Sequence, residues 1–219
     1  ATGLLRQIEL HFLSNEDENI RFGLLTDFAD APNQHMDNDD HLLALLTSGI
    51  QELNEKYRGK ADNDQPFFLF HRERRWNESE QCWMAWERKR GKLVELNKII
   101  LKNAETSYVV KIGDISWLSD VRYVITLDSD TILPQGVARK LIATFSHPLN
   151  QAVFDEKFEK IISGYTILQP RVQVKPTTVV KTYLTHLFAG EIGLDLYSRA
   201  VSDVYQDLFN EGIYVGKGI

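Results

Sequence analysis

Amphipathic stretches alternate with short apolar runs along the first 70 residues of the chain. Residues 3–14 and 42–57 repeat their apolar side chains every three or four positions, which predicts two helices that each bury one face. The runs 20–26 and 66–70 are short and apolar, and they predict strands. This order of elements indicates an α/β chain.

The same alternation continues in the second half. Residues 123–127 form an apolar, partly β-branched run that predicts a buried strand, and 137–145 predict the helix that follows it. Strands that alternate with helices imply βαβ units, so we expect a mostly parallel sheet flanked by helices in a single domain. The other expected elements are helices at 92–101, 177–187 and 198–209 and strands at 161–169 and 213–215.

The composition narrows the class of protein. With 219 residues, 43% hydrophobic and 26% charged, the chain has the profile of a soluble globular protein with a sizeable core. Its net charge of −6 argues against nucleic acid as a partner, because phosphate backbones select basic surfaces. A lone Cys82 excludes an internal disulfide, and no apolar run approaches the ~18 residues of a membrane span.

Two carboxylates, Asp128 and Asp130, end the apolar run 123–127. The sequence contains two further Asp-x-Asp matches, at 37–39 and 62–64, but these lie in polar stretches where a solvated loop or helix start is expected. Carboxylates two residues apart at a strand end can face one hard divalent cation, and such cations usually bridge to substrate phosphates. Asp128 and Asp130 therefore predict a metal and nucleotide site.

Asp27 and Asp30 also follow an apolar run. If both strands are parallel, Asp27 and Asp128 emerge at the same edge of the sheet, where a carboxylate can accept hydrogen bonds from a base or a ribose. Taken alone, a turn or helix-cap role is favoured for Asp27. Taken together with Asp128 and Asp130, a binding role is favoured.

Arg88, Lys89, Arg90 and Lys92 cluster around Gly91 at a predicted helix start. Backbone N–H groups and the helix dipole favour an anion there, so the cluster predicts a diphosphate site, and Gly91 would let the backbone approach it closely. The alternatives are a solvated basic helix start or a patch facing lipid headgroups. The nearby tryptophans could stack on sugar faces, although core packing is their commoner use; they are Trp76, Trp83 and Trp86.

Two later motifs could line a substrate groove or simply form turns. Gln169 and Arg171 follow a predicted strand, and glycines recur between residues 210 and 218. The six histidines contain no H-x-x-x-H pair, which argues against catalytic zinc. Metal-dependent nucleotidyl transfer and a non-catalytic nucleotide-sugar-binding role both stay open as alternatives to a sugar transferase.

Taken together, these motifs resemble the family-2-like glycosyltransferases of the GT-A fold, which is Rossmann-like, and in particular the glucosyltransferase module of bacterial cyclic β-1,2-glucan synthases. The likeness covers essentially the whole chain, with the Asp-x-Asp motif less specific than the others. It is carried by residues 22–32, 86–97, 123–131, 166–171, 188–191 and 200–209.

The resemblance implies an inverting transfer of glucose from UDP-glucose to a growing β-1,2-glucan, with Mg²⁺ or Mn²⁺, at the cytoplasmic face of the bacterial inner membrane. Membrane attachment would come from segments outside this chain. Asp27 would contact uracil, Lys92 the nucleotide, and Asp128 the ribose and diphosphate. The implied donor-binding residues are Asp27, Asp30, Arg90, Lys92 and Asp128, the metal ligands Asp128 and Asp130, and the acceptor-binding residues Gln169, Arg171, Gly212 and Gly216.

The chain also departs from the family pattern. The family has a first strand that would lie before Leu4, and an acidic motif supplying the general base that would lie beyond Ile219. We therefore expect a truncated GT-A domain over residues 1–219, whose catalytic base is not among its own residues. The isolated chain is predicted to show no glucosyl transfer.

Overall fold

The computed structural model describes residues 1–59, 65–101, 106–170, 208 and 218–219. Its contacts divide the chain into two compact units. The first comprises residues 1–122 with 132–138, and the second comprises residues 123–131 with 139–219.

A three-stranded mixed sheet forms the centre of the first unit. Its strands are β1 (Phe22–Asp27), β2 (Phe67–Arg72) and β5 (Tyr108–Ile112), in the order β1-β2-β5. β1 runs parallel to β2, whereas β5 runs antiparallel to it. Every residue of β2 is buried, because this central strand is covered on both faces.

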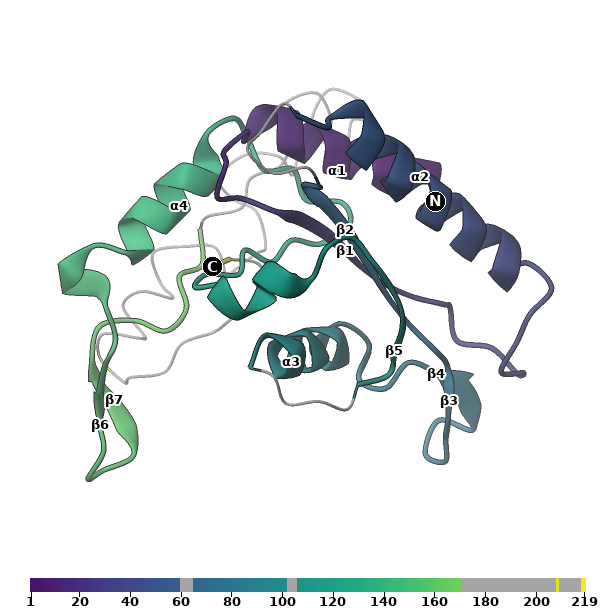
Figure 1. Cartoon of the computed structure of the whole chain (residues 1–219). Helices are drawn as coiled ribbons and strands as arrows, with labels where there is room; N and C mark the ends of the chain where they lie inside the picture. The colour runs from purple at the N-terminus through teal and green to yellow at the C-terminus, as the bar shows by residue number, and fades with distance from the viewer. Residues whose placement is uncertain (60–64, 102–105, 171–207, 209–217) are drawn as a thin grey trace, which may run out of the picture. The chain divides into compact units, whose positions relative to one another are not determined.

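Helices cover the two faces of this sheet (Figure 1). On one face, α1 (Thr2–Ser14) and α2 (Asp39–Lys56) pack Phe12 and Ile50 against Phe67 and Leu69. On the other, α3 (Arg88–Ile100) and the short helix η1 (Ser116–Asp120) pack against Phe68 and Phe70. Because side chains alternate along a strand, Arg72 falls on the α3 face with Phe68 and Phe70.

A small hairpin is tied to the segment that follows β1. It consists of β3 (Arg75–Asn77) and β4 (Cys82–Met84), which pair antiparallel. Trp83 and Ala31 exchange two backbone hydrogen bonds of 2.9 Å. The hairpin therefore braces the loop that carries Asp30.

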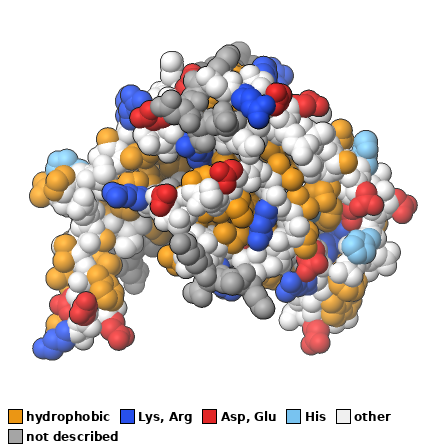
Figure 2. Space-filling view, in the orientation of Figure 1, with side chains coloured by type: hydrophobic (Ala, Val, Ile, Leu, Met, Phe, Trp, Pro, Cys, Tyr) orange, Lys and Arg blue, Asp and Glu red, His pale blue; other side chains and the backbone are white. Residues whose placement is uncertain are grey.

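The second unit contains a second hairpin, formed by β6 (Val153–Asp155) and β7 (Lys160–Ser163), after the short helix η2 (Pro148–Asn150). Figure 2 shows hydrophobic side chains gathered on this hairpin, with charged side chains at its tip. The exposed hydrophobic residues are Val153, Phe154, Phe158, Ile161 and Ile162. Helix α4 (Val137–Phe145) begins in the first unit and continues into the second.

Most of the predicted elements that fall on described residues are confirmed. The helices expected at 3–14, 42–57 and 137–145 are α1, α2 and α4, and the strands expected at 20–26 and 66–70 are β1 and β2. Helix α3 begins at Arg88, four residues before its predicted start. The elements expected at 177–187, 198–209 and 213–215 lie outside the described residues, apart from the single residue Leu208.

Two expectations about strands are wrong. Residues 123–127 form no strand: Thr126 makes an isolated bridge to Gly218, and the side chains of the segment are half-buried. The strand expected at 161–169 is shorter, because β7 ends at Ser163 and Gly164 follows with a positive φ of 75°. Apolar runs of this length do not distinguish a strand from an extended segment.

The expectation of a mostly parallel sheet is also wrong. Among the described strands, β1 and β2 are parallel, and the other three pairs are antiparallel. The reversal at β5 is associated with a contact to α3. Ser107 donates its backbone N–H to Glu95 of α3, so β5 begins beside Arg72, at the end of β2. The chain consequently re-enters the sheet in the opposite direction. The α/β class stands, with a mixed sheet and four described α-helices.

Candidate functional site

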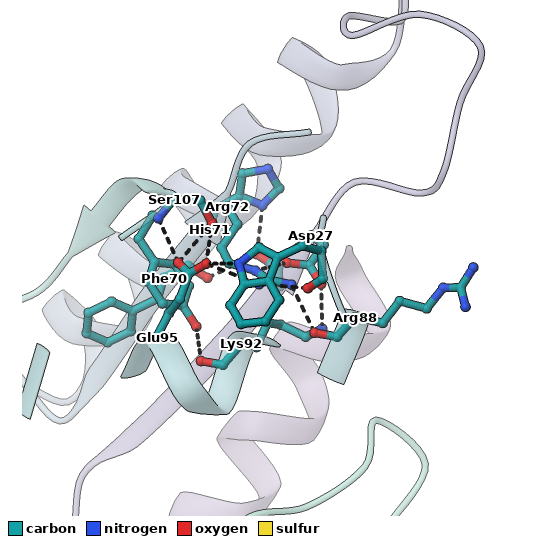
Figure 3. A network of polar contacts seen from close by, with 11 residues as sticks. Asp27, Phe70, His71, Arg72, Arg88, Lys92, Glu95 and Ser107 are labelled. Carbon is teal, nitrogen blue, oxygen red and sulfur yellow. Dashed lines mark hydrogen bonds and ion pairs between the residues drawn. The ribbon is translucent and has the colours of Figure 1, made fainter. Parts of the chain in front are cut away.

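Asp27 lies at the end of β1 and is held by two cations. Its Oδ1 accepts a hydrogen bond of 2.8 Å from Arg72 Nε, and its Oδ2 lies 3.0 Å from Lys92 Nζ. Arg72 ends the neighbouring strand β2, and Lys92 comes from the first turns of α3 (Figure 3). The predicted donor-binding residues Asp27 and Lys92 are thus brought together by the fold.

Arg72 connects Asp27 to the start of α3. Its side chain is 0% exposed. It donates to the backbone oxygen of Trp86 at 3.2 Å, to that of Arg88 at 2.9 Å, and to Glu95 Oε1 at 3.5 Å. A guanidinium with partners on three elements fixes their relative positions, because its donors form a rigid planar fork. Arg72 therefore sets where Lys92 meets Asp27.

Glu95 supplies the buried negative charge that faces Arg72. Its carboxylate accepts hydrogen bonds from Ser107 N at 2.7 Å, from Ser107 Oγ at 2.8 Å, and from the indole N–H of Trp86. Burial by itself would raise the pKa of Glu95. The hydrogen bonds from Trp86 and Ser107, together with the charge of Arg72, outweigh burial and lower that pKa. Glu95 is therefore an anion at neutral pH.

The start of α3 has a strained backbone that fits this network. Glu87 and Arg88 have positive φ values of 52° and 41°, in the left-handed region that costs non-glycine residues energy. A Cβ on Gly91 would overlap the carbonyl oxygen of Trp86 and would lie 2.7 Å from Arg72 Nη1. The close approach that Gly91 permits in this structure is therefore to the protein's own groups.

The loop after β1 is fixed by a second buried ion pair. Arg74 pairs with Asp39 and also donates to the backbone oxygens of Ala29 at 2.6 Å and Gln34 at 3.1 Å. The hydrogen bond from Arg74 lowers the pKa of Asp39 below its usual value. Asp39 opens α2, so the expected helix start at 37–39 is confirmed, although this carboxylate is buried rather than solvated.

Two further predicted residues lie at the surface of this unit. Asp30 Oδ2 is 2.7 Å from Nη2 of Arg88, whose side chain extends away from the buried network (Figure 3). Arg90 is 75% exposed and pairs with Glu87 on its own helix at 3.5 Å. Of the predicted donor-binding residues in this unit, Asp27 and Lys92 are in direct contact, and Arg90 contacts neither of them in the described structure.

In the second unit, backbone hydrogen bonds join three of the predicted motifs. Thr126 and Gly218 exchange bonds of 2.7 and 3.1 Å, and Leu168 and Ile219 exchange bonds of 2.9 and 3.0 Å. Gly218 has a φ of +153°, and a Cβ there would overlap the carbonyl oxygen of Leu168. Residues 218–219 therefore lie between the segment that leads to Asp128 and the segment that leads to Gln169.

The Asp-x-Asp pair itself forms a turn. Thr131 donates its backbone N–H to the carbonyl oxygen of Asp128 at 3.0 Å, and Asp130 is exposed. The described residues contain no group of three or more His, Cys, Asp or Glu side chains placed to hold a metal ion. The metal site therefore stays a prediction. Arg171, Gly212 and Gly216 lie outside the described residues.

Arg72 and Glu95 are not among the residues that the sequence predicts for this site. A signal for Arg72 exists, since it shares the alternation of Phe68 and Phe70 two residues past the apolar run 66–70. Glu95 falls outside the predicted apolar face of its helix, where a solvated glutamate is expected, so it has no local signal. Trp86 belongs to the network through its indole N–H, whereas Trp76 is 46% exposed and contacts Trp83 edge-on.

Comparison with known proteins gives one strong likeness. The chain is 39% identical over 217 residues to the cyclic β-(1,2)-glucan synthase NdvB of Rhizobium meliloti strain 1021. The chain is homologous to part of a cyclic β-(1,2)-glucan synthase. The match covers 99% of the chain but 8% of the length of NdvB. The predicted resemblance to a cyclic β-1,2-glucan synthase is thereby confirmed.

No family model matches the sequence. The helices in the described part of the chain include none that is long and apolar enough to cross a bilayer.

Proposed function

We propose that the chain is the donor-binding part of an inverting glycosyltransferase with a GT-A fold, which transfers glucose from UDP-glucose to a growing β-1,2-glucan. The observation that carries this proposal is the 39% identity to NdvB over 99% of the chain. The contact between Asp27 and Lys92 supports it from the structure, because it places an acceptor and a cation together at the end of a strand.

Asp27 and Lys92 would recognise different parts of the donor. Asp27 is the hydrogen-bond acceptor for the N–H of a uracil ring, and Arg72 orients it through the bond to Oδ1. Lys92 carries a compact positive charge suited to a phosphate group. Asp30 and Arg90 would border the same ligand from the surface of this unit.

Asp128 and Asp130 would hold Mg²⁺ or Mn²⁺. Their carboxylate oxygens are the ligand type that a hard cation prefers, so the donor set fits. When bound, the cation would supply positive charge that stabilises a departing diphosphate. Gln169, Arg171, Gly212 and Gly216 would border the glucan acceptor, and attachment to the cytoplasmic face of a membrane would come from other segments of a longer protein.

Calorimetric titration with UDP tests the proposal. The chain should bind UDP in the presence of Mn²⁺. Without the metal it should bind UDP about tenfold more weakly, a loss of about 1.4 kcal/mol in binding free energy. Asp130→Ala should remove the effect of Mn²⁺, and Asp27→Asn should weaken binding whether or not metal is present. Asp37→Ala, which alters the exposed aspartate of the 37–39 match, is the matched control and should bind as the unaltered chain does.

Absence of UDP binding to the unaltered chain would contradict the proposal. Binding that ignores metal and the Asp130 substitution would instead favour a nucleotide-binding role in which the Asp-x-Asp pair takes no part.

A further inference from the structure

The two oxygens of Asp27 are held in very different ways. Oδ1 is bound by Arg72, whose side chain is 0% exposed, and Oδ2 is bound by Lys92, whose side chain is 22% exposed. One oxygen therefore faces the interior of the protein, and the other faces a cation that solvent and ligands can reach.

Arg72 is unable to leave Asp27 at low cost. Its other nitrogen atoms bond Glu95 and the backbone oxygens of Trp86 and Arg88, and its departure would leave the buried Glu95 carboxylate without its cation. Gly91 accommodates the guanidinium at this position, since a Cβ there would lie 2.7 Å from Arg72 Nη1. Oδ1 is thus a fixed contact whether or not a ligand is present.

Lys92 is free of these constraints. Its ammonium group sits on a flexible four-carbon stem and is strongly hydrated, so it can exchange one anion for another nearby. Its backbone is held in place, because the Tyr108 hydroxyl donates to the Lys92 carbonyl oxygen at 2.9 Å. The ammonium group can therefore change partners while α3 stays where it is.

We infer that Lys92 couples recognition of the base to recognition of the diphosphate, an inference that rests on the proposed function. Without ligand, its ammonium group covers Asp27 Oδ2. A diphosphate draws the ammonium group away, and Oδ2 then accepts the hydrogen bond from the N–H of the base. A ligand with a base but no phosphate meets Asp27 with this oxygen already occupied.

The inference is testable because a substitution of Lys92 should change the affinities for UDP and for uridine in opposite directions. Replacement of Lys92 by an uncharged side chain of similar length removes the phosphate contact, and so weakens UDP binding. The same replacement exposes Oδ2, and so strengthens the binding of uridine. If Lys92 only stabilised the fold, its substitution would weaken the binding of both ligands or of neither.

The experiment compares UDP and uridine by ligand-observed NMR titration of the 219-residue chain, with Mg²⁺ constant in every sample. In Lys92→Met, we expect UDP to bind about tenfold more weakly and uridine about fivefold more tightly than in the unaltered chain. Lys98→Met, an exposed change of the same charge on the same helix, is the control and should alter neither affinity. Thermal unfolding of each variant checks that it is folded.

A second measurement needs no substitution. Since coupling between two ligands is reciprocal, inorganic pyrophosphate should raise the affinity of the unaltered chain for uridine several-fold. Lys92→Arg, which keeps the cation, should retain this enhancement, and Lys92→Met should lose it.

Uridine binding that is unchanged, weaker or undetectable in Lys92→Met would overturn the inference, as would the absence of any pyrophosphate effect in the unaltered chain. If the unaltered chain binds no UDP at all, it is the proposed function that fails. The two failures are therefore distinguishable.

Discussion

The segment around Asp27 and the segment around Asp128 both end an apolar run in carboxylates, yet the structure holds them by different means. Asp27 ends a true strand, and side-chain ion pairs with Arg72 and Lys92 fix it. The segment before Asp128 is instead held by backbone hydrogen bonds that Thr126 exchanges with Gly218.

Because of this difference, we expect substitutions at Asp27 and at Asp130 to affect stability and ligand binding in different proportions. A carboxylate in a buried charge network stabilises the fold and can also contact a ligand. Its substitution should therefore disturb both the stability of the fold and ligand binding. Asp130 is exposed at a turn, so its substitution should change ligand binding with little effect on the fold. The following substitutions test that contrast.

Arg72→Met should have the largest effect on stability. It leaves the buried Glu95 carboxylate without its cation, and the loss of one partner from a buried ion pair costs about 3–5 kcal/mol. Urea unfolding of the chain measures the change. Arg75→Met removes an exposed arginine that pairs with Glu73, and should cost about 0–1 kcal/mol. Equal costs for the two variants would contradict the buried network.

Gly218→Ala should act on the second unit through its backbone. Its positive φ and the overlap with the Leu168 carbonyl oxygen should cost about 1–3 kcal/mol locally. Hydrogen exchange should show faster exchange at the amides of Thr126 and Leu168, with no change in β2. Gly3→Ala, a helix position with open space around it, should instead leave exchange at those amides as it was.

The pH dependence of stability should report on Glu95. The pKa of Glu95 is lowered in the folded chain from its usual 4.5, so its contribution is fully present above pH 4.5 and is lost as the pH falls through the lowered pKa. Glu95→Gln should reduce the free energy of unfolding by about 1–3 kcal/mol at pH 7, and should flatten the fall of that free energy as the pH drops below 4.5. Glu52→Gln, which alters an exposed carboxylate on α2, should keep the original slope.

Asp130→Asn should have the smallest effect. An exposed substitution away from buried contacts usually changes the free energy of unfolding by less than about 0.5 kcal/mol. The same urea experiment checks this value. A loss of several kcal/mol would show that the turn at Asp130 supports the fold, and would remove the contrast with Asp27.

The positions of most helices and strands could be predicted because their signals are local. Ile8 and Phe12 in α1 lie four residues apart, as in a helix that buries one face, and β2 begins with the apolar residues Phe67–Phe70. The sequence also assigns Asp27 and Lys92 to one predicted site, and the structure brings their side chains into contact. The run 123–127 shows the limit, since the same apolar pattern gave an extended segment with one bridge.

The sequence by itself determined where most elements lie and which charged residues end them, since these properties depend on neighbours along the chain. The tertiary structure decided which charges meet. Arg72 and Asp27 are 45 residues apart, and Glu95 is 23 residues beyond Arg72. Their contact depends on the packing of α3 against the sheet. The antiparallel direction of β5 and the need for glycine at position 91 depend on that same packing, and no local pattern records it.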